Sequence, residues 1–549
     1  MKFPIKEKSW LGMCASFMLS IAPLTAALAA DERQSLEELR NTVINLLQAL
    51  VDQGVISREK AAQMVKQAQE KAAADAAALA KSEEGAVRVP YVPQIVKDEI
   101  SKQVAAQVEP AVVADVVKEA KQEQWGIPGA LPDWIRRGNI FGTIMVRQEG
   151  LLYGRNNMPN AYLNYNNVNA AGGIVKAGSN AFFDTTVDRF RFRGAARLGF
   201  ETSFSDSISA GLRLSTGNST DLVSPTQTLD GTAPYTFGLD NLYVRLDERT
   251  AQRFPWLSVI GGRFTSPWFT PTDLVFHKQL NFNGVAVTGR LGIGDGNAAQ
   301  SHVFLTLGAM PIQDLSPTVE NSLSSSSNKW LYAGQLGADL YFADNQRLRL
   351  AVALYDFLNY EGRLNAPFSN TNDFTAPQFF RIGNTVFDIR NNNDPTSNLF
   401  AIASKFRLVN IAASYDIPVG RYNFEFTADA VKNVGFNQSE ILARTGLNVA
   451  PHTKGYQGEI SFGHPAVLTA GTWRGLVGYR YLQRDAVIDA FTDSDFHYFG
   501  GTDATGYYLI GDYGVATRVW VRFRYQSANS IDGPTFDVDT VQLDLNARF

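Results

Sequence analysis

Arginines recur at alternate positions in one stretch of the chain, as Arg189, Arg191, Arg193 and Arg197. A β-strand places alternate side chains on the same face, so a strand here would carry these four cations as a basic ladder. A wall lined with arginine or lysine attracts anions, and anion pores are built this way. The alternative is that carboxylates pair with these arginines, which then hold the shape of the wall without selecting ions.

The same alternation places arginines on the polar face of other expected strands, at Arg213, Arg245, Arg347, Arg349, Arg474, Arg480, Arg518, Arg522 and Arg524. Acidic residues share these polar faces, at Glu201, Asp339, Glu425, Asp429, Glu459 and Asp544. An arginine that faces the middle of a lipid bilayer costs roughly 2–4 kcal/mol. The consistent placement therefore favours polar faces that line the lumen of a barrel, with the apolar faces toward lipid.

Two segments between strands could supply further functional side chains. The segment 266–273 contains Trp268, Phe269 and Asp273, and we expect it to fold inward as a constriction loop. The segment 485–503 contains five aspartates, a pattern that could bind Ca²⁺ or other cations. For that segment, a solvated acidic loop outside the barrel is the simpler interpretation.

The sequence offers no pattern for catalysis or for a metal site. None of the five histidines forms a ligand pair of the H-x-x-x-H kind, at His277, His302, His452, His464 or His497. The only cysteine, Cys14, lies in the apolar N-terminal stretch. We therefore expect no enzyme, no cofactor and no metal. The net charge of −4 over 549 residues gives no reason to expect nucleic acid as a partner.

Most of the chain has the period of β-strands. From Asn139 onward, apolar and polar residues alternate, and the many glycines and aromatic residues suit short strands and turns. Sixteen strands are expected, at about 139–148, 188–201, 206–216, 239–247, 256–264, 280–290, 301–310, 329–342, 346–360, 400–416, 421–433, 455–463, 472–484, 505–513, 516–528 and 537–549.

The last strand separates its two faces most clearly. Val541, Leu543, Leu545 and Phe549 lie on one face, and polar residues such as Asp544 lie on the other. A strand of this kind that ends on an aromatic residue resembles the C-terminal signal by which outer-membrane proteins are recognised for assembly. We therefore interpret these four apolar residues as an assembly signal.

The connections between the expected strands alternate in length. Long segments such as 149–187 and 361–399 are separated by tight turns such as 343–345 and 417–420. Outer-membrane barrels pair short periplasmic turns with longer external loops and have even strand numbers. A soluble β-protein, the alternative fold, has no reason to keep this parity. The predicted fold is an all-β transmembrane antiparallel barrel of about 16 strands.

The N-terminal part is expected to be different. Residues 1–30 have the basic, apolar and small-residue regions of a signal peptide, with cleavage near residue 29–30. Residues 31–124 have helical periodicity and are predicted to form a periplasmic helical arm, whose short apolar stripe suits either a coiled coil or a helical hairpin. Residues 125–138 would be a linker, and the barrel would occupy 139–549.

Several stretches also resemble the bacterial "putative porin" family of outer-membrane proteins. They occur in the family's order at 39–47 (LRNTVINLL), 50–54 (LVDQG), 211–218 (GLRLSTGN), 273–276 (DLVF), 280–285 (LNFNGV), 489–497 (DAFTDSDFH) and 531–534 (IDGP). The resemblance implies a β-barrel pore with an N-terminal helical segment. It implies no particular solute and no established site residues.

Taken together, these patterns predict a porin in the outer membrane of a Gram-negative bacterium. It would pass small hydrophilic solutes by diffusion, with a preference for anions. The alternative is a plugged structural barrel that links the outer membrane to peptidoglycan or a periplasmic partner through the helical arm. Expected partners are outer-membrane lipid and lipopolysaccharide, the assembly machinery, the solutes themselves and further copies of the chain in a trimer.

Overall fold

The computed structural model describes residues 133–217, 222, 225–232, 234–293, 301–315, 327–392, 394 and 396–549, and a few positions between 60 and 74. The chain divides into two units, Met1–Val113 and Ala114–Phe549. In the first unit the described residues are helical and exposed, and Lys66 Nζ lies 4.0 Å from a carboxylate oxygen of Glu70. The expected signal peptide, the linker up to residue 132 and the rest of the arm lie outside the described residues.

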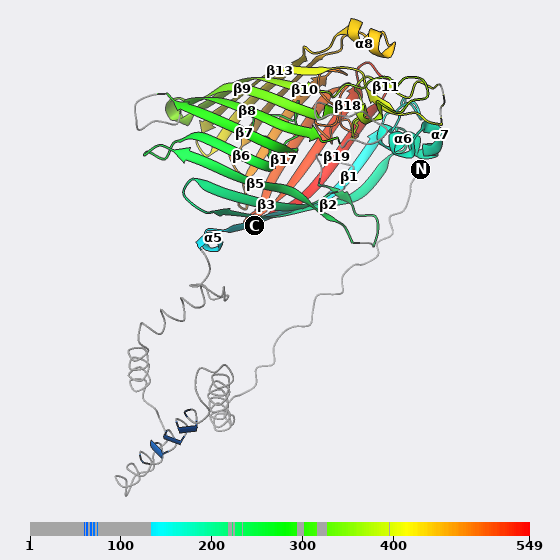
Figure 1. Ribbon diagram of the computed structural model, residues 1–549. Helices are drawn as coiled ribbons and strands as arrows, with labels where there is room; N and C mark the ends of the chain where they lie inside the picture. The colour runs from blue at the N-terminus through cyan, green and yellow to red at the C-terminus, as the bar shows by residue number, and fades with distance from the viewer. Residues whose placement is uncertain are drawn as a thin grey trace, which may run out of the picture. The chain divides into compact units, whose positions relative to one another are not determined.

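The second unit is a closed antiparallel barrel (Figure 1). Its main sheet has 17 strands, of which β4 (Gln227–Thr228) is a two-residue segment, so the wall itself has 16 strands, as predicted. These are β1 (Asn139–Tyr153), β2 (Arg189–Ser203), β3 (Ile208–Thr216), β5 (Phe237–Arg249), β6 (Pro255–Thr265), β7 (Asn281–Gly292), β8 (His302–Gln313), β9 (Lys329–Tyr341), β10 (Arg347–Leu358), β13 (Phe406–Val419), β14 (Tyr422–Asn433), β15 (Lys454–Gly463), β16 (Trp473–Leu482), β17 (Ala504–Ala516), β18 (Val519–Ser530) and β19 (Asp537–Arg548).

Pairing of the first and last strands closes the barrel. The register of β1 against β19 runs from Thr143 opposite Arg548 to Tyr153 opposite Val538. Beyond the end of β19, the backbone N–H groups of Gly142 and Phe549 each donate to the other residue's carbonyl at 3.1 Å. Closure leaves no unpaired edge strand in this described 16-strand wall, which is what a sheet needs in a medium without water.

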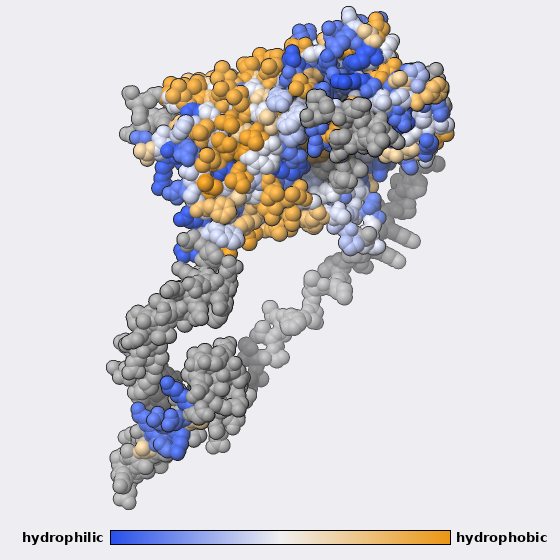
Figure 2. All heavy atoms as spheres, in the orientation of Figure 1, coloured by the Kyte–Doolittle hydropathy of each residue, from blue (hydrophilic) through white to orange (hydrophobic). Residues whose placement is uncertain are grey.

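The two faces of the wall differ as the alternation predicts. On β2, Phe190 is 71% exposed on the outside, and on β19, Gln542 and Asp544 are nearly fully buried inside. Figure 2 shows apolar side chains gathered over the strands and hydrophilic ones over the long loops. Among the described residues, no helix is long and apolar enough to cross a membrane.

Connections at one end of the barrel are longer than those at the other. At the short-turn end, the strands join through segments such as 204–207, 342–346, 420–421 and 517–518. At the long-loop end, the connections include 154–188, 359–405, 434–453 and 483–503. Short helical segments lie at both ends of the barrel. At the short-turn end these are α5 (Asp133–Arg136) and η3 (Ala343–Asn345), and in the long connections they are α6 (Tyr165–Ala171), α7 (Ile174–Ala177), η1 (Gly178–Ala181), η4 (Asp373–Thr375) and α8 (Gln438–Thr445).

Two sequence expectations about the strands were wrong. The predicted strand 400–416 is two elements, β12 (Phe400–Ile402) and β13, and β12 pairs with β11 (Val386–Asp388) inside a long loop. The run Ala401-Ile402-Ala403 is fully buried on both faces, so it has no alternation to place it in the wall. Arg518 does not face the lumen, because it occupies a tight turn with a φ of 60° and is exposed.

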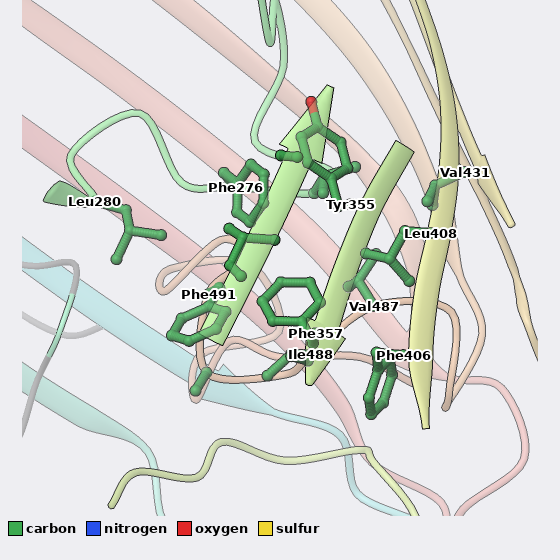
Figure 3. Close-up of a cluster of buried hydrophobic side chains, with 14 of the residues drawn as sticks. Phe276, Leu280, Tyr355, Phe357, Phe406, Leu408, Val431, Val487, Ile488 and Phe491 are labelled. Carbon is green, nitrogen blue, oxygen red and sulfur yellow. The ribbon is translucent and has the colours of Figure 1, made fainter. Parts of the chain in front are cut away.

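An apolar cluster fills part of the lumen (Figure 3). Three long connections fold inward to form it with the inner faces of β10, β13 and β14: residues 266–280, 359–405 and 483–503. Phe276 from the first of these lies 4.9 Å, ring centre to ring centre, from Tyr355 on β10. The barrel is therefore not an empty tube, and the lumen is divided into an apolar side and a polar side.

Candidate solute pathway

The polar side of the lumen is the wall formed by β18, β19, β1 and β2. Arg147 on β1 lies near its centre and is only 5% exposed. Its guanidinium donates to both carboxylate oxygens of Asp544 at 2.7 and 3.0 Å. It also donates to Asp495 at 2.9 Å, and Asp495 belongs to the inward loop 483–503. Arg147 therefore joins the wall to a loop that crosses the lumen.

The basic ladder of β2 pairs with one carboxylate. Glu149 on β1 is 2.5 Å from Arg191 and 3.2 Å from Arg193, and its own side chain is almost fully buried. Gln542 on β19 donates to the same carboxylate at 2.9 Å. Two guanidinium groups thus share one carboxylate, so the ladder carries more positive than negative charge at this height.

Seven other arginines that were predicted to line the pore also contact polar groups of the protein. Arg189 donates to the hydroxyl of Tyr498 at 3.2 Å. The remaining ion pairs are Arg197–Asp240 at 3.4 Å, Arg213–Asp240 at 2.6 Å, Arg347–Asp339 and Arg349–Asp339 at 2.7 Å each, Arg522–Asp512 at 2.7 Å and Arg524–Asp495 at 3.6 Å. In four places, therefore, arginines share a single carboxylate, namely Glu149, Asp240, Asp339 and Asp495, the last of which also pairs with Arg147.

The loop 483–503 is held inside the barrel by contacts with other loops. Thr492 donates its hydroxyl to the carbonyls of Asp273 and Leu274 at 3.0 and 2.9 Å. The side chain of Asn384 donates to the carbonyls of Arg484 and Val487 at 2.7 and 2.8 Å. These contacts therefore hold the loop near its start and at its middle, where Thr492 is fully buried.

Cavities follow the polar wall. One of about 360 Å³ opens toward the long-loop end and is lined by Arg191 and Arg193, among others. A second, of about 210 Å³, lies toward the short-turn end and is lined by Arg147 and Arg197. Both are lined by Ser494 and Asp495, so this dipeptide separates them. A third, of about 250 Å³, shares Arg522 and Arg524 with the second.

The predicted constriction loop 266–273 does fold inward, but its residues have different places. Trp268 is 4% exposed and belongs to the apolar cluster. The backbone N–H of Phe269 donates to Gln335 at 2.7 Å, and its carbonyl accepts from the same side chain at 3.0 Å. Of the three predicted residues, only Asp273 lines one of these cavities, the third. The residues between the first two cavities come instead from loop 483–503.

The acidic segment 485–503 is not the solvated external loop that the sequence suggested. Asp485 and Asp489 are buried, and Asp493 lies 3.4 Å from Arg480. Among the described residues, no group of three or more His, Cys, Asp or Glu side chains could hold a metal ion. The aspartates instead contact arginines and polar groups inside the barrel.

The comparisons with known proteins fit this arrangement. The family model described as "Putative porin" matches residues 40–549. The chain belongs to the putative porin family. It is thus an outer-membrane β-barrel from a family of channels rather than of enzymes, and the short-turn end is periplasmic while the long-loop end is extracellular.

Solved porin structures are similar only at a distance. OmpF of Salmonella typhi in complex with daunomycin is 12% identical, with 75% of this chain and 97% of that chain covered and a TM-score of 0.40. OprB of Pseudomonas putida at high pH is 12% identical, with 76% and 96% covered and a TM-score of 0.41. No curated protein matches the chain. The family match alone therefore carries the assignment.

Three residues that matter most in this porin were missed from the sequence. Arg147 and Glu149 lie on the inward face of β1, but the expected strand ended at residue 148, so Glu149 was placed in a loop. Arg147, Gln148 and Glu149 are polar in succession, so the alternation breaks there and gave no signal that the strand continues to Tyr153. Asp495 had no signal either, because its partners are on strands far away in the chain.

Burial and nearby positive charges have opposite effects on the pKa values of two aspartates in the inward loop, Asp495 and Asp489. Burial would raise the pKa of Asp495, but the positive charges of Arg147, Arg193 and Arg524 outweigh it and hold this pKa well below its usual value. For Asp489, burial dominates and raises the pKa to about 8. Asp495 is therefore charged at neutral pH, whereas Asp489 holds a proton.

We predict that the inward loop of this porin loosens as the pH rises through about 8. The folded-state pKa of Asp489 lies above the usual value of about 3.9, so its contribution to loop packing is complete below that value and is lost as the pH passes 8. Conductance should rise between pH 7 and pH 9. In an Asp489→Asn variant, which stays neutral, this rise should disappear. An unchanged pH profile in the variant would contradict the prediction.

Proposed function

We propose that this porin passes small hydrophilic solutes along the wall of β18, β19, β1 and β2 and prefers anions. The observation that supports the preference is the charge of the first two cavities. Together they are lined by seven arginines, Arg147, Arg191, Arg193, Arg197, Arg381, Arg522 and Arg524, and by three carboxylates, Glu149, Asp495 and Asp544. This is an excess of four positive charges, in a chain whose net charge is −4.

The ion pairs reduce this field without cancelling it. Because pairs of arginines share single carboxylates, each such group keeps a net positive charge in a confined, partly desolvated space. Charges on low-dielectric walls focus the potential into the cleft between them and raise the local concentration of the opposite ion. The two alternatives that the sequence left open are thus compatible. Single arginines can pair with carboxylates while the ladder as a whole keeps a positive field.

Flux into proteoliposomes tests this proposal. Gluconate and glucosamine have similar size and opposite charge, so their entry rates compare charge at nearly constant volume. We expect gluconate to enter severalfold faster than glucosamine, with neutral glucose between them. Faster entry of glucosamine would contradict the anion preference.

A plugged structural barrel is the second candidate, and the apolar cluster formed by three inward connections favours it. The same flux assay separates the two functions, because a plugged barrel would admit none of the three solutes. The proposed periplasmic arm at 31–124, signal cleavage near residue 29–30 and assembly into trimers have support from sequence patterns only. Cross-linking of the intact chain in cells would identify any partner of the arm.

We also propose that the apolar face of the terminal strand, with Val541, Leu543, Leu545 and Phe549, is recognised during assembly. Phe549 is 50% exposed, and its ring lies over Gly142 at the seam between β1 and β19. A Phe549→Ser variant should therefore reach the outer membrane in much smaller amounts, as measured by heat-modifiable barrel on a gel. Phe342 is equally exposed at the periplasmic end, so Phe342→Ser is the matched control and should assemble normally. Equal loss in both variants would refute a specific signal.

A further inference from the structure

The outer wall has a hollow on its lipid-facing side. Ala413, Ala428 and Gly458 are direct cross-strand neighbours on β13, β14 and β15. The row continues with Tyr479 and Tyr507 on β16 and β17. Three small side chains beside two tyrosines leave an apolar groove of about 520 Å³, whose other walls are Phe426, Ile460 and Val477.

The floor of this groove is open at Gly458. A Cβ atom added there would come no closer than 3.9 Å to any heavy atom outside its chain neighbours, the nearest being the carbonyl oxygen of Thr427. A larger side chain at this position would therefore extend into the groove without displacing the wall. The groove is thus a depression in the surface, because within the described part of the chain no side chain fills the space next to this glycine.

Two lysines lie above the groove at the extracellular end of the same strands. Lys432 and Lys454 are exposed cross-strand partners. Each is four residues from the groove floor, counted from Ala428 and Gly458 respectively, which is about 14 Å along a strand and on the same face. Within the described part of the chain, no carboxylate forms an ion pair with either ammonium group.

Aromatic and basic neighbours continue this surface. Tyr456 lies between Lys454 and Gly458 on β15, and its ring stacks on Tyr481 with 5.0 Å between centroids. Exposed tyrosines at this height are typical of the belt where a barrel meets the headgroup region. On β13, Arg407 is exposed at the same end, where it forms an ion pair with Asp356 at 2.9 Å. From the extracellular end toward the middle of the strands, the outer surface therefore carries first cations, then tyrosines and then the apolar groove.

We propose that this wall binds one molecule of lipopolysaccharide through its lipid A part. The phosphates would contact Lys432 and Lys454, and an acyl chain would lie in the groove above Gly458. The position of the lysines decides the kind of lipid, because they lie at the extracellular end, where the outer leaflet of a Gram-negative outer membrane consists of lipopolysaccharide. A second copy of the chain fits this surface less well, since an apolar partner wall would leave both ammonium groups without counter-charges.

Binding to the refolded full-length protein in detergent tests the site. The probes are purified lipid A and the same lipid after phosphatase treatment, and bound lipids are counted by native mass spectrometry. We expect a Lys432→Gln, Lys454→Gln double variant to bind lipid A roughly thirtyfold more weakly, the effect of two basic residues at an anionic lipid surface. The dephosphorylated lipid should bind this variant and the unmodified protein equally.

Two further variants make the outcome specific. Gly458→Leu fills the groove and should weaken the binding of both lipids. Arg421→Gln with Arg518→Gln removes the same charge from the periplasmic end and should leave binding unchanged. All variants are first confirmed as folded by heat modifiability. Equal lipid A affinity of the lysine variant and the unmodified protein would overturn the proposal. So would a change of oligomeric state in Gly458→Leu without loss of lipid, which would make this wall a contact between copies.

Discussion

Replacing Arg191 and Arg193 with glutamine should lower the anion-to-cation permeability ratio of this porin by about fivefold. A unit charge about 4 Å from an ion acts with about 1 kcal/mol even in water, which corresponds to this factor. Both arginines line the cavity toward the extracellular end and share Glu149. Their loss would remove half of the positive excess along the proposed passage. The measurement is the reversal potential of single channels in a salt gradient.

The structure offers a closely matched control. Arg347 and Arg349 also share one buried carboxylate, that of Asp339, but they lie on β10 and line none of the three polar cavities. Replacing both with glutamine changes the net charge of the chain by the same amount. We expect this variant to keep the selectivity of the unmodified porin. An equal shift in both variants would mean that total charge, rather than the ladder on β2, determines selectivity.

Removing the inward loop should have the largest effect on conductance. Replacing residues 485–502 with a short Gly-Ser linker removes Ser494 and Asp495, which separate the first two cavities. It also removes Val487, Ile488 and Phe491 from the apolar cluster. Single-channel conductance should increase severalfold. Anion preference should also rise, because Arg147 and Arg524 lose the carboxylate of Asp495.

Shortening a different long loop controls for the deletion itself. Residues 437–450 in the β14–β15 connection contain α8 and line none of the three polar cavities. Their removal should leave conductance close to that of the unmodified porin. If both deletions raise conductance equally, loop 483–503 is not the element that narrows the passage.

Much of this fold could be predicted because barrel strands are a local pattern. On β2 and β19, alternation alone separated the outer residues, such as Phe190 and Leu543, from inner ones such as Asp544. Counting such segments gave sixteen strands, and the parity of the connections favoured a barrel over a soluble fold. Segments without this alternation could not be assigned correctly to the wall or to a loop. Residues 401–403 are apolar at consecutive positions, and the sequence placed them in a wall strand. They are apolar because they are buried on both faces inside a long loop.

The candidate site was only partly predictable for a different reason. The ladder from Arg189 to Arg197 was visible because its members share one strand. Its carboxylate partners, Glu149 and Asp240, lie on β1 and β5. In the same way, no spacing in the sequence relates Arg147 to Asp495 across 348 residues. The five aspartates after residue 484 suggested solvation. The inward course of their loop instead depends on hydrogen bonds with distant residues: the Thr385 hydroxyl donates to Asp485, and the Asn384 side-chain oxygen accepts from the backbone N–H of Asp489.

The most direct test of the central proposal is single-channel recording of the refolded, unmodified porin in a planar bilayer under a KCl gradient. We predict stable open steps and a reversal potential whose sign shows chloride to be more permeant than potassium. A barrel that is folded by heat modifiability and yet silent would contradict the proposed passage and favour the plugged alternative. Open steps with a reversal potential of the opposite sign would keep the channel but contradict the role given to its arginines.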